Sequence, residues 1–466
     1  MSVISCLQDL RKVGRVEFDQ KTLESYAHGL SYHAPIQPEM VFRAFSEKDI
    51  VNCLTTCNKY SIPVVTVSGR SSLEGQTVPL SKGVVILDTS YMDKVVAIHE
   101  EDLDCVVEPG CNWVELAAEL KECGLFFPPD PGMAAMIGGM CGTNCSGSFA
   151  WRYGTMKDNV ISLRVVLADG TVIKTRRRPT KSSAGYDLTR LIIGSEGTLG
   201  VVSQATLKLR RIPTEQAVLI AQFPSIVEAA NTAMNVVQSG LMVNRMEFLD
   251  EFAMKSVNLA NAQKNPRHEN ATLLFECVAS CKASLQYQMD ALASICKEQN
   301  SILFERDTSE ASNELWNIRK SAFFASKSLR PDVDCDVLTT DVAVPISHLK
   351  EMLIATRNDL QENNIVATIV AHAGDGNIHC FIPMNKSCPE EVHHAEQFKK
   401  RNAQLALDFD GTCTGEHGVG QSKRKLLIEE LGVETVNVMR RIKKELDPKS
   451  ILNPGKVFSL SPESKL

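Results

Sequence analysis

A strand–helix–strand pattern that occurs three times after Pro213 constrains the fold of this chain more than any other feature. In each unit an apolar, β-branched stretch is followed by an amphipathic stretch of helical period and then by a second apolar stretch. An antiparallel sheet with helices on one face is the economical fold for such units. The three units span residues 217–248, 271–307 and 337–372, and Pro213 marks the expected domain boundary before them.

Three Gly-rich segments lie before that boundary, at residues 69–75, 128–147 and 194–200. A β-branched stretch, 63–69, runs directly into the first, and a strand that feeds a Gly/Ser loop can present consecutive N–H groups to a pyrophosphate. Taken alone, this first loop fits a plain β-turn equally well. The long segment 128–147 costs conformational entropy unless a ligand orders it. Three such loops among short strands and helices predict a mixed α+β domain that binds a cofactor.

Two histidines and a glutamate have the composition of a metal site. His372 and His379 lie in a Gly-rich segment where the last strand–helix–strand unit ends, and the pair Glu416-His417 follows further along the chain. Two imidazoles and a carboxylate can hold a divalent cation with open coordination positions, and zinc and manganese both suit this set. His417 would then be an unligated base beside the carboxylate. The alternative is that these are turn residues with a packed imidazole.

Composition excludes several classes of protein. A chain of 466 residues should form two or more domains, and its 44% of hydrophobic residues indicates a globular protein. The net charge of -6 and a single short basic run, Arg176–Arg178, disfavour a nucleic-acid partner. The 15 cysteines include no C-x-x-C pair, which favours buried thiols in a reducing compartment over metal fingers or iron–sulfur clusters. No apolar run approaches the roughly 20 residues of a membrane span.

The two ends of the chain carry expectations about location. The N-terminus lacks the charged and apolar regions of a secretory signal, and acidic Asp9, Glu17 and Asp19 disfavour a mitochondrial presequence. The last residues, Ser464-Lys465-Leu466, match the tripeptide that the peroxisomal import receptor binds. We therefore expect a peroxisome or a related microbody such as a glycosome, with that receptor as a partner.

Together these segments resemble the vanillyl-alcohol oxidase and p-cresol methylhydroxylase superfamily of FAD enzymes, and specifically its D-lactate dehydrogenase and D-2-hydroxy-acid dehydrogenase branch. The resemblance extends from about Pro38 to Phe458 and rests on five segments in the family's order, which are 128–147 with 152–156, 194–200, 372–379, 416–420 and 452–456. It implies an α+β protein with a two-subdomain FAD-binding domain of the p-cresol methylhydroxylase type, a cap domain with an antiparallel sheet, and a C-terminal segment that returns to the FAD domain. The expected ranges are 1–213, 214–410 and 411–466.

The resemblance also implies roles for individual residues. It implies that His372, His379 and Glu416 ligate a divalent metal and that His417 is the base. Arg319 would hold the substrate carboxylate through two parallel hydrogen bonds, although it could instead be an exposed residue on a helix face. The residues implied in FAD binding are Ser68, Gly69, Arg70, Ser71 and Ser72 at the pyrophosphate, Pro131, Gly138, Gly139, Thr143, Ser146, Gly194, Glu196, Gly197 and Gly200 along the cofactor, and Asn453 and Lys456 near the flavin.

Two departures from the family pattern affect these expectations. The pyrophosphate loop of relatives reads closer to Gly-Ala-Gly-Thr-Ser, whereas residues 67–72 here are bulkier, and the absence of His or Cys from this loop predicts a non-covalent flavin. Relatives that act on D-2-hydroxyglutarate carry a lysine near the stretch that corresponds to 338–345, and this chain has none there. A monocarboxylate such as D-lactate is therefore the expected substrate.

The expected reaction is oxidation of D-lactate to pyruvate. Hydride would pass from C2 to flavin N5 while a metal-bound hydroxyl loses its proton to His417. A flavin oxidase that acts on glycolate or another small 2-hydroxy acid is one alternative. A metal-dependent hydrolase is another, but it leaves the three Gly-rich segments and residues 453–456 without a role, and a ligand-sensing protein that is not an enzyme is the weakest. The electron acceptor stays open.

Overall fold

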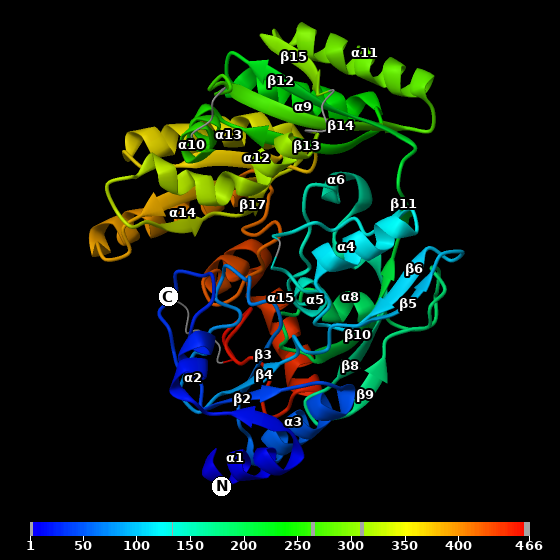
Figure 1. The fold of residues 1–466 in the computed structure, drawn as a ribbon. Helices are drawn as coiled ribbons and strands as arrows, with labels where there is room; N and C mark the ends of the chain where they lie inside the picture. The colour runs from blue at the N-terminus through cyan, green and yellow to red at the C-terminus, as the bar shows by residue number, and fades with distance from the viewer. Residues whose placement is uncertain (1–2, 133, 262–265, 308–311, 461–466) are drawn as a thin grey trace. The chain divides into compact units, whose positions relative to one another are not determined.

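The computed structural model of the protein describes residues 3–132, 134–261, 266–307 and 312–460. Contacts between residues divide the chain into two compact units (Figure 1). Among the helices of these described residues, none combines the length and apolarity that crossing a membrane requires. The first unit comprises Met1–Gly147, Tyr153–Ile212 and Glu416–Leu466, and the second unit comprises Ser148–Arg152 and Pro213–Gly415.

A small, mostly parallel sheet with strand order β1-β2-β4-β3 lies in the first unit. Strands β2 and β3 both run parallel to β4, and β1 pairs antiparallel with β2. The apolar, β-branched sequence of β3 suits such a buried strand. Helices α1 and α3 pack together, and buried Leu10 and Leu54 join them to the core of this sheet. The bounds are β1 Arg15–Glu17, β2 Met40–Arg43, β3 Val64–Val67, β4 Val85–Asp88, α1 Val3–Val13, α2 Gln20–Ala27 and α3 Glu47–Tyr60.

A second sheet of the first unit is antiparallel, with strand order β5-β6-β10-β8-β9, and β7 pairs with β11 in a separate two-stranded sheet. Gly170 makes the tight turn between β8 and β9 with a φ of +90°, which glycine adopts without strain. The bounds of the strands are β5 Val95–His99, β6 Asp104–Val107, β7 Leu125–Phe126, β8 Val160–Val166, β9 Val172–Lys174, β10 Val201–Lys208 and β11 Arg210–Arg211. The helices are α4 Trp113–Glu122, α5 Ile137–Thr143, α6 Ala150–Tyr153, α7 Met156–Asn159, α8 Leu188–Ile192 and α15 Arg424–Leu446.

The C-terminal residues of the first unit return to its parallel sheet. Leu452 forms a parallel bridge with Val64 in β3. Buried Lys443, in α15, pairs with Asp447 and donates hydrogen bonds to the carbonyl oxygens of Thr198 and Leu452, each at 2.7 Å. A buried ammonium needs acceptors for its protons, so this cluster holds the C-terminal residues beside the third Gly-rich segment.

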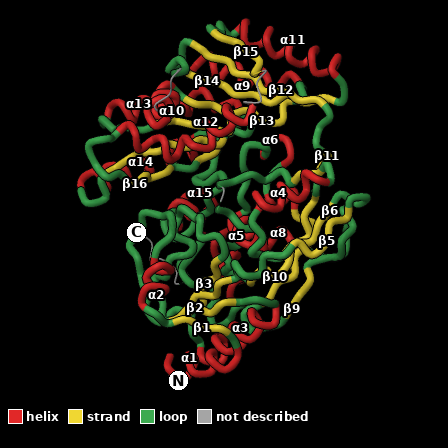
Figure 2. The backbone as a smooth tube through the Cα atoms, in the orientation of Figure 1, coloured by secondary structure: helices red, strands yellow, loops and turns green. Residues whose placement is uncertain are grey.

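The second unit is built on a large antiparallel sheet with strand order β15-β12-β14-β13-β18-β19-β16. Figure 2 shows strands of this sheet in yellow, among them β12 to β16. Strand β17 pairs with β19 beside this path, and each strand pair of the sheet is antiparallel, as predicted. The bounds are β12 Glu215–Phe223, β13 Val243–Leu249, β14 Ala271–Ala279, β15 Leu303–Asp307, β16 Asp336–Thr339, β17 Val342–Ala343, β18 Thr368–His372 and β19 Asn377–Met384.

Helices cover both faces of this sheet, so the prediction of helices on one face is incomplete. Leu274 in β14 packs with Ile318 of α12 and Met254 of α10 in one apolar cluster. Cys277, which points to the opposite face of β14, lies near Cys296 of α11. Burial of β14 on both faces requires cover on both sides, which the strand–helix–strand pattern did not reveal. The bounds are α9 Ile226–Ser239, α10 Glu251–Asn261, α11 Lys282–Glu298, α12 Ser312–Ala325, α13 Leu349–Glu362 and α14 Pro389–Asp408.

The segment that holds the two predicted metal-ligating histidines is a β-hairpin. His372 is the last residue of β18, and a turn that includes Gly376 at φ +79° leads into β19. His379 therefore lies within a strand, opposite Val370, whereas the sequence pattern predicted no strand beyond His372. A strand places both imidazoles more rigidly than a loop does.

Candidate active site

His372 and Glu247 form the central buried pair of the second unit. They are direct partners on the antiparallel strands β18 and β13, and His372 Nδ1 lies 2.7 Å from Glu247 Oε1. The Glu247 side chain is fully buried. Because an ionised carboxylate only accepts hydrogen bonds, Nδ1 carries the imidazole proton, and Nε2 is the nitrogen that can coordinate a cation.

His379 has the same arrangement with a different acceptor. Its Nδ1 lies 3.2 Å from the carbonyl oxygen of Thr340, which again assigns the proton to Nδ1. The rings of His372 and His379 meet edge to face with centroids 5.5 Å apart, and their candidate ligand atoms lie within 4.8 Å of each other. Two imidazoles at this separation suit one shared cation.

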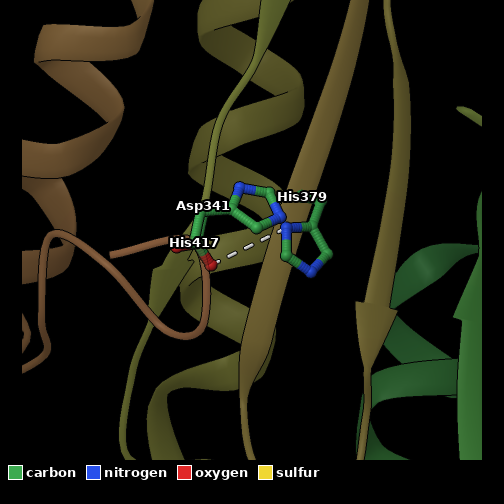
Figure 3. A group of neighbouring side chains, drawn as sticks. All are labelled: Asp341, His379 and His417. Atoms are coloured by element: carbon green, nitrogen blue, oxygen red, sulfur yellow. Dashed lines mark ion pairs between the residues drawn. The ribbon is translucent and has the colours of Figure 1, made fainter. Parts of the chain in front are cut away.

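Asp341 is a further buried carboxylate beside these histidines. Its Oδ1 lies 3.8 Å from His379 Nδ1, as the dashed line in Figure 3 shows. It accepts hydrogen bonds from Asn377 Nδ2 at 2.9 Å and from Thr414 Oγ1 at 2.7 Å. Thr414 precedes Glu416 by two residues, and consecutive Cα atoms are about 3.8 Å apart. Glu416 therefore stays within two residues of Thr414, whose hydroxyl group is hydrogen-bonded to Asp341.

In the first unit, hydrogen bonds fix the segment that carries Glu416 and His417. Ser146 Oγ donates to Glu416 Oε2 at 2.6 Å, and Gln76 Nε2 donates to the carbonyl oxygen of His417 at 2.7 Å. Gly420 has a φ of +53°, and a Cβ there would lie 2.0 Å from the carbonyl oxygen of Glu74. The sequence Glu-His-Gly-Val-Gly therefore needs its last glycine for both conformation and space.

Glu196 holds the same segment from the third Gly-rich loop. Its carboxylate accepts hydrogen bonds from the backbone N–H groups of Val419 at 2.6 Å and Gly420 at 2.8 Å. Burial raises the pKa of Glu196 to about 7, although these two hydrogen bonds oppose the change. The resemblance implied that Glu196 lines the cofactor. In the structure its carboxylate instead binds the backbone of the segment that follows His417.

Arg319 lies in α12 with its side chain largely buried. Its Nε is 2.7 Å from Glu247 Oε2, so Arg319 and His372 share one carboxylate. The alternative of an exposed residue on a helix face therefore does not hold. A guanidinium in this setting keeps further N–H groups that could bind a substrate carboxylate.

The predicted pyrophosphate loop directly follows β3. Among the described residues, no acceptor contacts the backbone N–H groups of Arg70, Ser71 and Ser72. Arg70 has a φ of +53°, its guanidinium lies 4.2 Å above the ring of Tyr26, and it donates to the Ser25 carbonyl oxygen at 2.7 Å. The bulky side chain is thus turned onto α2, and the backbone N–H groups remain for an anion.

The glycines that the resemblance places along the cofactor are of two kinds. Some pack closely against neighbouring atoms, and others face open space. A Cβ at Gly69 would lie 2.2 Å from the carbonyl oxygen of Ala134, and Gly138, Gly194 and Gly200 also face close neighbours. Gly139 and Gly197 face open space, with no atom within 4 Å of a Cβ. Pro131 and Thr143 are half-buried, and Ser68 Oγ contacts Thr89 Oγ1 at 2.8 Å.

The side chain of Asn453 best tests whether the residues of the first unit fit an FAD molecule. Its Nδ2 donates to the carbonyl oxygens of Gln76 and Glu196 at 3.2 and 2.8 Å, and its buried Oδ1 has no hydrogen-bond partner among the described residues. A buried acceptor without a donor is costly, and a ligand N–H group would satisfy it. Lys456 donates to the carbonyl oxygens of Gly75 and Val78 at 2.6 Å each, and burial lowers its pKa to about 7. The residues of this unit therefore fit an FAD.

Comparison with known families agrees with this geometry. Residues 38–176 match the FAD binding domain family, and residues 212–457 match the family described as FAD linked oxidases, C-terminal domain. The second match alone covers more than half of the chain, so the chain belongs to the FAD-linked oxidase family. It is a flavoprotein oxidoreductase, as predicted.

Particular relatives narrow this class. The chain is 46% identical over 440 residues to the mitochondrial D-lactate dehydrogenase [cytochrome] of Arabidopsis thaliana, which covers 93% of this chain and 76% of the relative. It is 32% identical over 437 residues to the glycolate oxidase subunit GlcD of Bacillus subtilis, with 93% and 92% covered. Solved p-cresol methylhydroxylase with bound substrate shares the fold, with a TM-score of 0.83, 16% identity and coverage of 99% and 98%. The predicted superfamily is confirmed, and so is an α+β fold of the p-cresol methylhydroxylase type.

The predicted location is wrong. Four relatives that are 37–46% identical over 91–98% of this chain have names that place them in mitochondria, not in peroxisomes or glycosomes. Ser464–Leu466 lie outside the described residues. Three terminal residues carry little information beside similarity over such a length, and the peroxisomal import receptor has no support as a partner.

Glu247 and Asp341 are residues of the site that the sequence patterns did not reveal. Each is a carboxylate whose side chain is fully buried. A signal existed for Glu247, because it stands between apolar Met246 and Phe248 in a strand that the pattern already predicted. A charged residue in the middle of a buried strand needs a charged or hydrogen-bonding partner, so its position in the sequence predicts a buried polar site.

Proposed function

We propose that this protein oxidises D-lactate to pyruvate with non-covalently bound FAD and one divalent cation, zinc or manganese. The observation that carries the proposal is the pair of imidazoles, His372 and His379, each held through Nδ1 by a buried acceptor. Such acceptors orient the ring of a metal-bound histidine and raise its basicity. The identity to a D-lactate dehydrogenase over 93% of the chain supports D-lactate as the substrate.

The first unit supplies the groups that would hold FAD. The backbone N–H groups of Arg70, Ser71 and Ser72 suit the pyrophosphate, and the buried Oδ1 of Asn453 suits a flavin N–H group. The open positions at Gly139 and Gly197 leave space for the cofactor. Residues 68–72 contain neither His nor Cys, which supports a flavin without a covalent link to this loop.

When bound, FAD supplies a hydride acceptor, and the cation lowers the pKa of the substrate hydroxyl. His372, His379 and Glu416 would hold the cation. His417 takes the hydroxyl proton as the base, because it adjoins a ligand and Gln76 holds its backbone. Arg319 binds the substrate carboxylate. These residues thus orient the hydroxy acid, hold its carboxylate and accept its proton.

The electron acceptor and a second substrate are also proposals. The word cytochrome in the name of the Arabidopsis thaliana relative supports a cytochrome as the acceptor. Glycolate is the second candidate substrate, supported by the Bacillus subtilis relative. Both substrates are monocarboxylates, consistent with the lack of a cationic residue in 338–345.

The purified protein allows a direct test of this function. We expect a flavin absorption spectrum, FAD in the supernatant after acid precipitation, about one divalent cation per chain, and cytochrome reduction with D-lactate at a higher kcat/KM than with glycolate. Faster turnover of glycolate would assign the second substrate. A colourless protein that releases no FAD would contradict the proposal, and yellow colour in the acid pellet would contradict the non-covalent flavin.

A further inference from the structure

Glu247 contacts two residues to which the proposed function gives different tasks. Its Oε1 lies 2.7 Å from Nδ1 of His372, a proposed metal ligand, and its Oε2 lies 2.7 Å from Nε of Arg319, the proposed substrate-binding residue. The three side chains come from β18, β13 and α12, and Glu247 is fully buried. One carboxylate thus joins the cation site to the carboxylate-binding site within the second unit.

We propose that Glu247 is a positioning residue that couples metal affinity to substrate affinity, an inference that rests on the proposed function. Through Oε1 it holds His372 in the tautomer that coordinates through Nε2 and makes that nitrogen more basic. Through Oε2 it forms an ion pair with Arg319, which balances the buried charge of the guanidinium and holds it near His372. The terminal N–H groups of the guanidinium then remain for a substrate carboxylate.

A purely structural ion pair is the alternative, and the same sheet contains one for comparison. Glu276 in β14 is also a buried carboxylate, and it pairs with Arg245 on the neighbouring strand β13. Arg245 packs over the ring of Trp316 at 3.9 Å. Glu276 therefore matches Glu247 in burial and in having an arginine partner, but its described partners include no imidazole. A role in coupling must distinguish Glu247 from Glu276.

The test compares Glu247→Gln with Glu276→Gln in the FAD-loaded protein. Zinc affinity is measured by competition with a chromogenic chelator, and D-lactate affinity by the steady-state KM, with flavin content and Tm as measures of folding. We expect Glu247→Gln to weaken zinc binding by about 10- to 100-fold, the usual effect of removing a partner of a ligating histidine. We expect a raised KM for D-lactate in the same variant, and Glu276→Gln to retain wild-type zinc affinity and KM.

Variants of His372 and Arg319 show what each change does alone, the loss of zinc and the rise in KM, so that both effects can be recognised together in a Glu247 variant. His372→Ala should lose zinc, and Arg319→Gln should raise KM while it keeps zinc. Glu247→Gln should show both changes, and Glu247→Asp provides a variant that retains the charge if Glu247→Gln does not fold. The shorter carboxylate of Glu247→Asp cannot reach both partners, so this variant should also lose zinc affinity or raise KM.

Two results distinguish failure of this inference from failure of the proposed function. Wild-type zinc affinity and KM in a folded Glu247→Gln or Glu247→Asp protein would overturn the role of Glu247 and leave the proposed function intact. A wild-type protein that binds neither zinc nor manganese, and whose flavin D-lactate does not reduce, would overturn the proposed function and the role of Glu247 with it.

Discussion

Ser146 Oγ donates a hydrogen bond of 2.6 Å to Glu416 Oε2 within the first unit. Ser146 lies near the end of the second Gly-rich segment, which the resemblance placed along the cofactor, and Glu416 is a proposed metal ligand. Ligating carboxylates are commonly held by such neighbours. The proposed FAD and metal sites therefore share a structural element, and disturbance of the Gly-rich segment should reach the metal ligand.

Replacing Ser146 tests this connection. Ser146→Ala should weaken zinc binding by roughly 10-fold, because the carboxylate of Glu416 loses the hydroxyl that orients it. Zinc titration against a chelator measures the effect. Ser162→Ala is the matched control, since Ser162 is also buried in the first unit but donates to Thr206 Oγ1 at 3.0 Å, away from Glu416. Equal zinc affinities in the two variants would refute the role of Ser146.

Replacing His417 tests whether this residue acts as the base or as a metal ligand. His417→Ala should keep its FAD and its zinc but lose reduction of the flavin by D-lactate, because the proton acceptor is absent. Removal of a general base typically lowers the rate by about 10²- to 10⁴-fold. Stopped-flow absorbance of the flavin and metal analysis measure the two properties. Normal flavin reduction in His417→Ala would reject this assignment, and loss of zinc would make His417 a ligand.

Gly420→Ala should destabilise the fold more than an ordinary glycine substitution at positive φ. A Cβ at Gly420 would meet the carbonyl oxygen of Glu74 at 2.0 Å, whereas Gly240, at φ +72°, faces open space. Gly240→Ala carries only the backbone strain and serves as the control. We expect Gly420→Ala to lower the free energy of unfolding by about 1–3 kcal/mol more, the usual cost of overpacking. Urea unfolding measures both variants, and equal losses would show that the clash relaxes freely.

Glu196 should make stability depend on pH. Burial raises its pKa from 4.5 to about 7, so between these values the folded state holds a proton that the unfolded state has released. This contribution to stability is therefore fully present below pH 4.5 and is lost as pH rises through about 7. It amounts to at most roughly 3–4 kcal/mol, at about 1.4 kcal/mol per pKa unit.

The comparison of wild type with Glu196→Gln isolates this contribution. The free energy of unfolding is measured by urea titration at pH 5 and pH 8. Groups that do not interact with Glu196 cancel in the difference between the two proteins. Lys456, whose pKa Glu196 raises, does not cancel, so a Glu196→Gln, Lys456→Met double variant compared with Lys456→Met serves as the control. Wild type should lose stability relative to Glu196→Gln as the pH rises from 5 to 8. A difference that stays constant over this interval would mean that the pKa of Glu196 is not raised.

Local patterns in the sequence predicted much of the fold. Ser46 caps α3 by accepting a hydrogen bond from the N–H of Asp49, and a serine followed three residues later by an acidic residue is a local signature of a helix start. The strand–helix–strand units predicted β12 to β15, because each pattern depends only on residues close in the chain. The histidines were found for the same reason, since unusual residues stand out in short Gly-rich segments.

Contacts between distant residues account for what the sequence did not predict. His372 and Glu247 are separated by 125 positions, and only the register of β13 against β18 brings them together. The two carboxylate oxygens of Glu196 face Val419 and Gly420 across 223 and 224 positions. No local spacing encodes such pairs, so the partners that orient the site emerged only with the fold.

Anaerobic titration of the purified protein with D-lactate and with L-lactate tests the central claim most directly. If the protein is an FAD-dependent D-lactate dehydrogenase, D-lactate should bleach the flavin absorption bands, L-lactate should leave them unchanged, and prior removal of the cation with a chelator should prevent bleaching by D-lactate. Flavin bands that D-lactate does not bleach in the metal-loaded protein would contradict the account.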